Sequence, residues 1–264
     1  MSVEILSTGW YSNDGDYTWK TSGDDSIRSV AFRELWWYSI ENFISPEKVF
    51  IVDSNSPVLP DDKKYTDIPI EWLRLSINPG HAQNTQYHYC GWMASVILGL
   101  EYALLNGIEY FLYVEQDALV YGKKFIEQIE KKLIKNKYVF GSGTGTPQPL
   151  QQSIFAIRKD AMREFLSHLH SINQGDNKLS PEIKFELASK NSLFYYLMKF
   201  FYEKNIFEQH KEMITYKLLM KNKSYDVLPF GYGRTRPINF NDNCFYFQHA
   251  SIDEIEQYKN LVGF

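Results

Sequence analysis

The sequence predicts an α/β protein in which helices cover both faces of a mostly parallel β-sheet. Over residues 1–170, short apolar runs of strand length alternate with longer segments whose apolar residues recur at the helical period. The runs 49–52 and 110–114 contain no charged residue, which is typical of strands buried on both faces of a parallel sheet. The alternation itself favours parallel pairing, because parallel strands need a crossover segment between them.

Six segments fit strands, because each is short and apolar at its centre. Val49-Phe50-Ile51-Val52, for example, stops at a turn cluster, 54–57, that contains Ser, Asn and Pro. In chain order, the expected strands cover residues 3–9, 48–53, 70–77, 110–114, 138–141 and 153–158.

Helices are expected between these strands. Asp24 and Ser26 can cap the first of them. In the second, Trp92, Val96 and Leu100 recur every four residues, and Asn106-Gly107 ends the pattern. In chain order, the expected helices cover residues 27–43, 86–105, 124–135 and 159–170.

The chain after residue 170 has a different pattern. It is mainly helical to about residue 220 and then irregular, with many Gly, Arg, Pro and Asn residues. Ser251 and Glu254 fit a capping box that opens a last short helix. A chain of 264 residues suits one domain, with an α/β core at 1–170 and a helical and loop region at 171–264.

The composition is that of an ordinary globular protein, with 44% hydrophobic and 23% charged residues. The net charge of -4 indicates neither a nucleic-acid partner nor a membrane surface. Because we find no signal peptide and no apolar stretch of about 18 residues, we expect a cytoplasmic protein without a transmembrane segment. Cys90 and Cys244 lie outside any metal-binding spacing, so free thiols are expected.

Polar residues that directly follow the strands are the candidate site, because open α/β sheets bind ligands beyond the carboxyl ends of their strands. Glu115-Gln116-Asp117, the 115–117 segment, follows one buried strand. Its two carboxylates point the same way on an extended chain and repel each other, unless a cation lies between them or one takes up a proton. Mg²⁺ or Mn²⁺ would relieve that repulsion and bridge to phosphates. A solvated acidic turn is the alternative, against which the flanking apolar residues argue.

Two other strand ends offer candidates of lower specificity. Asp53 could accept hydrogen bonds from a nucleobase, and a plain Asx-turn explains it equally well. Thr8 and Gly9 are small, which lets a ligand approach the backbone.

The late irregular region adds cationic and imidazole groups. Arg234 and Arg236 bring two guanidinium groups to a glycine-rich turn, which suits a diphosphate or a solvated basic loop. His249 follows the apolar run 244–247 and is either a nitrogen ligand of the metal or a packed residue.

Together these residues resemble the nucleotide-sugar-dependent glycosyltransferases of the GT-A fold, which is Rossmann-like. Ile51-Val52-Asp53-Ser54-Asn55-Ser56 looks like the second-strand signature, whose Asp contacts the nucleobase. The segment 78–84 looks like the Asn-x-Gly loop before a long helix, and 111–117 lies where the DxD motif belongs. The segment 152–160 resembles the strand beneath the acceptor site. The resemblance covers about residues 1–170 and, more loosely, 229–250.

The resemblance implies an enzyme that moves a sugar from a UDP-, GDP- or dTDP-sugar to a hydroxyl of a glycan or other acceptor. Mn²⁺ or Mg²⁺ would be held by Asp117, Glu115 and His249. Asp117 is the safer ligand, because the family usually has Asp where this chain has Glu115. The nucleotide-sugar site would then comprise Thr8, Gly9, Asp53, Asn78, Gln116, Arg234 and Arg236.

Inverting members of the family place a carboxylate base in a loop ahead of a helix. Glu182 fits by position, because Ser180 and Pro181 suit a helix start whose dipole favours an ionised carboxylate. Glu186 and Asp176 are the alternatives. Ordinary helix-start chemistry explains Glu182 just as well.

Two other functions stay open. A nucleotidyltransferase that makes nucleotide-sugars should carry a Gly-rich loop with Lys and Arg after the first strand, yet residues 10–22 contain one Lys and no Arg. A non-catalytic sugar-binding protein of the same fold predicts loss of the metal carboxylates, and both are present.

Overall fold

The structure, a computed structural model, describes residues 2–13, 23–142, 150–204 and 224–264. One seven-stranded sheet has the order β3-β2-β1-β4-β7-β6-β8. Strand β7 runs antiparallel to both neighbours, and the other pairs are parallel, so the predicted mostly parallel α/β sheet is confirmed. The strands are β1 Leu6–Trp10, β2 Val49–Asp53, β3 Ile70–Arg74, β4 Tyr110–Val114, β6 Tyr138–Ser142, β7 Leu150–Arg158 and β8 Asp226–Val227.

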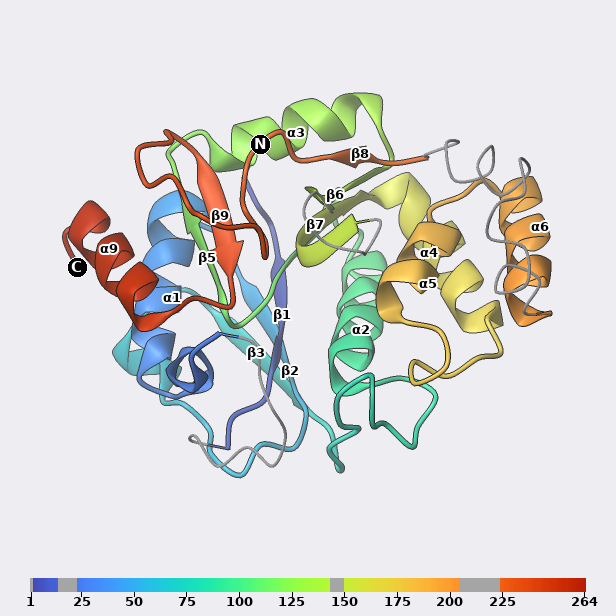
Figure 1. Cartoon of the computed structure of the whole chain (residues 1–264), viewed down its shortest axis with the longest axis horizontal. Helices are drawn as coiled ribbons and strands as arrows, with labels where there is room; N and C mark the ends of the chain where they lie inside the picture. Colours follow the sequence, from blue (N-terminus) through green and yellow to red (C-terminus); the bar gives the residue numbers. More distant parts are fainter. Residues whose placement is uncertain (1, 14–22, 143–149, 205–223) are drawn as a thin grey trace.

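Helices cover both faces of this sheet (Figure 1). Alternate side chains of each strand enter opposite cores, as in β2, where Ile51 packs with one helix layer and Phe50 and Val52 with the other. The first layer contains α1 Phe32–Phe43, α3 Phe125–Lys135 and α9 Ile252–Val262, and the second contains α2 Gly91–Leu105, α4 Lys159–Ser171 and α5 Pro181–Ala188. Helix α6, Ser192–Glu203, packs on α5. No described helix combines the length and apolarity of a membrane span.

A second, two-stranded sheet pairs β5, Ala118–Tyr121, antiparallel with β9, Phe245–Gln248. In the region after residue 170 that was predicted as mainly helical and then irregular, the structure adds two short strands, β8 and β9. Both strands are short, two and four residues, and each acquires its structure by pairing with a strand far away in the chain. Local patterns carry little signal for such pairing.

Element boundaries differ from the prediction mainly at the N-terminal ends. The Asp24 side chain accepts a hydrogen bond from the Ser26 backbone N–H, but it caps a short 3₁₀ helix, η1 Asp25–Arg28, and α1 begins later at Phe32. Helix α2 likewise begins at Gly91, after a Cys90 cap, rather than near residue 86. The predicted final capping box at Ser251 is confirmed. Residues 143–149 of the predicted loop lie outside the described residues. The predicted helix beyond residue 204 does so as well.

Close packing of α2 on β1 depends on Gly99. A Cβ atom at this position would lie 2.3 Å from Ser7 Oγ and 3.0 Å from Phe111 Cε2. We expect Gly99→Ala to lower the free energy of unfolding by about 1–3 kcal/mol, because overpacking outweighs the better helix propensity of Ala. Urea unfolding measures this change. The double variant Gly99→Ala/Ser7→Ala, which removes the nearest atom, should recover part of the loss; a neutral Gly99→Ala would contradict the packing argument.

Candidate functional site

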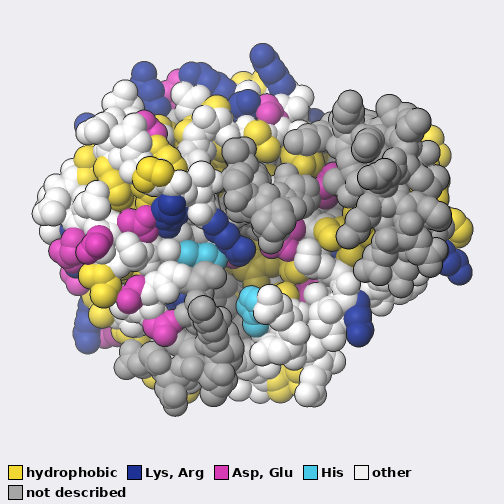
Figure 2. All heavy atoms as spheres, in the orientation of Figure 1, with side chains coloured by type: hydrophobic (Ala, Val, Ile, Leu, Met, Phe, Trp, Pro, Cys, Tyr) yellow, Lys and Arg dark blue, Asp and Glu magenta, His cyan; other side chains and the backbone are white. Residues whose placement is uncertain are grey.

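A cleft of about 830 Å³ opens at the carboxyl edge of the parallel strands. Its walls come from the ends of β1 and β4, the loop before α2, the start of α5 and the irregular segment before β9. Figure 2 shows histidine and basic side chains close together near the middle of one face of the molecule. The predicted site residues that line the cleft are Gly9, Asn78, Glu115, Gln116, Asp117, Asp176, Glu182, Arg234 and His249.

The pairing of β5 with β9 brings Asp117 and His249 together. Ala118 pairs with Gln248, so the residues that flank this pair, Asp117 and His249, meet at the edge of the cleft. Asp117 Oδ2 lies 3.6 Å from His249 Nε2. Both side chains are largely buried, with 7% and 15% of their surfaces exposed. Residues far apart in the sequence thus form one oxygen-and-nitrogen pair.

Arg236 holds the backbone of His249 in place. His249 has a φ of 56°, in the left-handed region that costs a non-glycine residue energy. Arg236 Nη2 donates to the carbonyl oxygens of Gln248 and His249 at 2.8 and 3.3 Å, and the guanidinium pairs with Glu254. Arg236 does not line the cleft. These bonds give Arg236 a positioning role, and its expected contact with a diphosphate stays a prediction.

The imidazole of His249 is neutral near pH 7. Burial lowers the pKa of His249 to about 4, although the Asp117 carboxylate beside it acts in the opposite direction. Nearby guanidinium groups, Arg234 first among them, lower this pKa further. Because a metal ion binds the unprotonated nitrogen, His249 is in the form that a metal ligand requires.

Burial and the charge of Asp117 both favour the protonated form of Glu115. Its side chain is half-buried, and burial, followed by the charge of Asp117, raises the pKa of Glu115 to about 8. The backbone of the segment is fixed, since the Glu115 carbonyl accepts a hydrogen bond from Trp36 Nε1 at 2.9 Å. Asp117, whose Oδ2 lies beside the His249 nitrogen, is the carboxylate that is better placed for a cation. This agrees with its ranking from sequence, though the ligand roles stay predictions.

The donor set fits a divalent ion that is coordinated partly by the protein and partly by a substrate. Among the described residues, no group of three His, Cys, Asp or Glu side chains is arranged to hold a metal alone. Mg²⁺ in nucleotide sites characteristically has only one or two protein carboxylates, and phosphate oxygens and water fill its other positions. Asp117 with His249 meets that requirement.

Arg28 and Arg234 form the basic wall of the cleft. Arg28 Nη2 donates to Asp117 Oδ2 at 2.9 Å. Burial lowers the pKa of His81, which also lines the cleft, and the charges of Arg234 and Arg28 add to this effect. Sequence reasoning missed Arg28, because a single Arg in a helix start has no distinguishing pattern. His81 lay within the recognised loop 78–84 but was not singled out.

Gln116 connects the 115–117 segment to the end of β1. Its Oε1 accepts from the Tyr11 backbone N–H at 2.6 Å, and its Nε2 donates to the Tyr11 carbonyl at 2.9 Å. The amide thus fixes Tyr11, which lines the cleft. Gly9 packs closely there, since a Cβ would lie 2.6 Å from Ser95 Oγ. Thr8 is fully buried and lies outside the cleft lining.

Asp53 ends β2 as predicted, but its carboxylate is bonded within the protein. It accepts from the Ser56 backbone N–H at 3.0 Å and from the Ser56 hydroxyl, and it pairs with Arg74 Nε at 3.2 Å. The side chain is fully buried and does not line the cleft. These contacts match the Asx-turn alternative. Asn78 does line the cleft, where its Oδ1 accepts from the Gly80 N–H at 2.9 Å.

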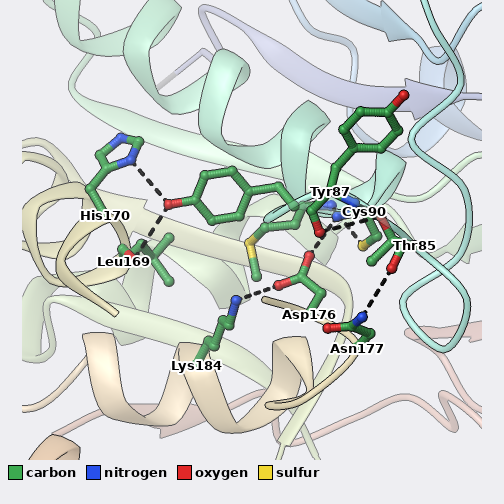
Figure 3. A network of polar contacts seen from close by, with 10 residues as sticks. Thr85, Tyr87, Cys90, Leu169, His170, Asp176, Asn177 and Lys184 are labelled. Carbon is green, nitrogen blue, oxygen red and sulfur yellow. Dashed lines mark hydrogen bonds and ion pairs between the residues drawn. The ribbon is translucent and has the colours of Figure 1, made fainter. Parts of the chain in front are cut away.

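The three candidate bases lie in different surroundings. Asp176 is buried in a network that joins the loop before α5 to the loop before α2: its oxygens accept from Cys90 N at 2.7 Å and Lys184 Nζ at 2.6 Å (Figure 3). Glu186 is buried, lies 3.4 Å from Lys190 Nζ and is absent from the cleft lining. Glu182 lines the cleft and is half-buried. Asp176 also lines the cleft, but both of its oxygens are engaged in the hydrogen bonds with Cys90 and Lys184. A base must reach its substrate, so the more exposed Glu182 fits best by geometry.

The sequence matches no model of a known protein family and no curated protein. Solved structures with a similar fold include the glycosyltransferase GlyE of Streptococcus pneumoniae TIGR4 (TM-score 0.46, 9% identity, 96% of this chain and 56% of that one). A putative glucose-1-phosphate thymidylyltransferase from Bacillus anthracis has a TM-score of 0.44 and 8% identity over 98% of this chain and 94% of that one.

The mannosyltransferase PcManGT from Pyrobaculum calidifontis, in complex with GDP-Man and Mn²⁺, has a TM-score of 0.42 and 14% identity over 72% of this chain and 51% of that one. The chain thus spans only about half the length of the two glycosyltransferases. Both glycosyl- and nucleotidyltransferases are among these structures.

Proposed function

We propose that this protein is a glycosyltransferase that uses a nucleoside-diphosphate sugar and a divalent metal ion. The meeting of Asp117 and His249 at the carboxyl edge of the sheet is the observation that carries this proposal. Glu115 lies beside them, and Arg28 and Arg234 line the same cleft. A cation-binding pair next to two guanidinium groups suits a ligand that carries a diphosphate.

Asp117 and His249 are the residues that would hold Mn²⁺ or Mg²⁺, with Glu115 beside them. When bound, the ion supplies Lewis-acid stabilisation of the negative charge that grows on the departing diphosphate. Arg234 neutralises part of the same charge. The nucleoside then extends toward the end of β1, where Tyr11 and Gly9 line the cleft.

Glu182 acts as the base on the acceptor side of the cleft. The acceptor hydroxyl oxygen bonds to the anomeric carbon, the bond from that carbon to the diphosphate breaks, and the hydroxyl proton moves to Glu182. A direct displacement of this kind inverts the anomeric configuration. Glu182 stands in the first turn of α5, where the helix dipole stabilises a negative charge.

Glu182→Gln tests this role. We expect the turnover number for donor hydrolysis to fall about a hundredfold, because general-base catalysis contributes at least that factor. The affinity for nucleoside diphosphate with Mn²⁺ should stay within about twofold, since Gln keeps the shape of the side chain. Calorimetry and a continuous assay of nucleotide release measure the two quantities. An unchanged turnover number would place the base elsewhere.

The proposed reaction is tested by incubating the protein with UDP-, GDP- and dTDP-sugars in the presence of Mn²⁺. We expect slow release of nucleoside diphosphate from at least one of them, with water as the acceptor. Formation of a nucleotide-sugar from a nucleoside triphosphate and a sugar phosphate, with no donor hydrolysis, would instead identify a nucleotidyltransferase.

A further inference from the structure

We propose that Arg28 exchanges partners during binding: it neutralises Asp117 before the metal ion binds, and it contacts the donor diphosphate afterwards. This inference rests on the proposed function and assigns to Arg28 a role in the order and coupling of binding.

Arg28 occupies the side of Asp117 that a cation needs. Its Nη2 lies 2.9 Å from Asp117 Oδ2, the same oxygen that lies 3.6 Å from His249 Nε2. A metal ion held by Asp117 and His249 would have to approach this oxygen. A divalent ion and a guanidinium group repel each other at such distances, and partial burial strengthens the repulsion. Metal binding at Asp117 therefore drives the Arg28 guanidinium away.

The backbone that carries Arg28 is fixed beside the site. Gly23, with a φ of 78°, packs against the backbone of His249, where a Cβ would lie 2.6 Å from the carbonyl carbon. The Asp24 N–H donates to the Ala250 carbonyl at 2.9 Å. Ile27 is 1% exposed and anchors η1 in the core. Only the Arg28 side chain is then required to move, so the released guanidinium stays within the cleft.

A diphosphate offers the released guanidinium a new partner. Arg28 and Arg234 both line the cleft. The planar guanidinium group can donate two parallel hydrogen bonds to phosphate oxygens, a geometry that matches phosphate better than a point charge does. When the donor binds together with the metal ion, its diphosphate thus gives Arg28 a negatively charged partner in place of Asp117.

This exchange couples the two binding events. Arg28 opposes binding of the metal ion alone and favours binding of the nucleotide with the metal ion. Each ligand therefore strengthens the binding of the other by the same factor.

Arg28→Met separates the two effects, with Arg234→Met as the matched control. Arg234 also lines the cleft, but no hydrogen bond joins it to Asp117 within the described part of the chain. We expect Arg28→Met to raise the affinity for Mn²⁺ alone about tenfold, the equivalent of one charged hydrogen bond. Arg234→Met should raise it by about twofold at most, through loss of a more distant charge. Electron paramagnetic resonance of free Mn²⁺ measures both.

The second measurement uses whichever of UDP, GDP and dTDP binds the unsubstituted protein most tightly, in the presence of saturating Mn²⁺. Both variants should lose about tenfold in affinity for this nucleotide. Arg28→Lys, which keeps the charge, should leave the affinity for Mn²⁺ alone near that of the unsubstituted protein. Unfolding curves in urea confirm that each variant is folded.

Arg28→Met with unchanged or lower affinity for Mn²⁺ alone would overturn the exchange, as would an equal increase in both Met variants. Unchanged nucleotide affinity in Arg28→Met would overturn its contact with the diphosphate. If the unsubstituted protein binds Mn²⁺ but no nucleoside diphosphate, the proposed function fails, and the Mn²⁺ titrations still decide whether Arg28 competes with the cation.

Discussion

Asp117→Ala should abolish metal-dependent nucleotide binding, with a loss of at least about a hundredfold in affinity for nucleoside diphosphate in the presence of Mn²⁺. Asp117 is 6% exposed, and its Oδ2 faces both His249 and Arg28. Its removal takes away the carboxylate of the 115–117 segment that lies beside the His249 nitrogen. Donor hydrolysis should fall to the background rate.

Glu115→Gln is the matched control for this variant. Burial, followed by the charge of Asp117, raises the pKa of Glu115 to about 8, which favours its protonated form near neutral pH. A neutral amide therefore resembles its resting state, and we expect a loss of only about tenfold. Equal losses in Asp117→Ala and Glu115→Gln would contradict the ranking of the two ligands. Full activity of Asp117→Ala would place the metal site elsewhere.

The second large effect concerns a buried ion pair beneath the cleft. Arg33 is fully buried, with its Nε 2.9 Å from Asp62 Oδ1. Its guanidinium carbon lies 4.7, 4.4 and 5.2 Å from the ring centres of Trp10, Trp36 and Trp37. Asp62 also accepts from Trp37 Nε1 at 2.7 Å. Burial lowers the pKa of Arg33, and the charge of Asp62 opposes that shift.

Asp62→Ala should lower the free energy of unfolding by about 3–5 kcal/mol, because it leaves a guanidinium buried without its counter-ion. Urea unfolding followed by tryptophan fluorescence measures the change. The double variant Asp62→Leu/Arg33→Met, which removes both charges, should lose less than the single variant. A loss below about 1 kcal/mol for Asp62→Ala would show that the cluster contributes little.

This cluster also supports the candidate site. Trp36 Nε1 donates to the Glu115 carbonyl, and Trp10 lines the cleft at the end of β1. Loss of the Asp62 charge should therefore disturb Trp36, which holds the Glu115 carbonyl, and Trp10 at the end of β1.

The sheet and the strand-end carboxylates were predictable from sequence because their signals are local. The buried run before Glu115, for instance, becomes β4 with the predicted bounds. The position of a residue just after such a strand places it at the carboxyl edge without any knowledge of the other strands.

Contacts between residues far apart in the sequence were not predictable in the same way. The apolar run before His249 was visible, but only its pairing with β5 shows that His249 meets Asp117. Arg236 looked like a phosphate ligand, whereas its hydrogen bonds go to the backbone around His249. Arg28 had no local signal, because its contact with Asp117 depends on where η1 packs.

Isothermal titration with UDP, GDP and dTDP, each with and without Mn²⁺, tests the central claim most directly. We predict that at least one nucleoside diphosphate binds with Mn²⁺ and that its affinity falls at least about tenfold without the metal ion. Absence of binding by all three in the presence of Mn²⁺ would contradict the account.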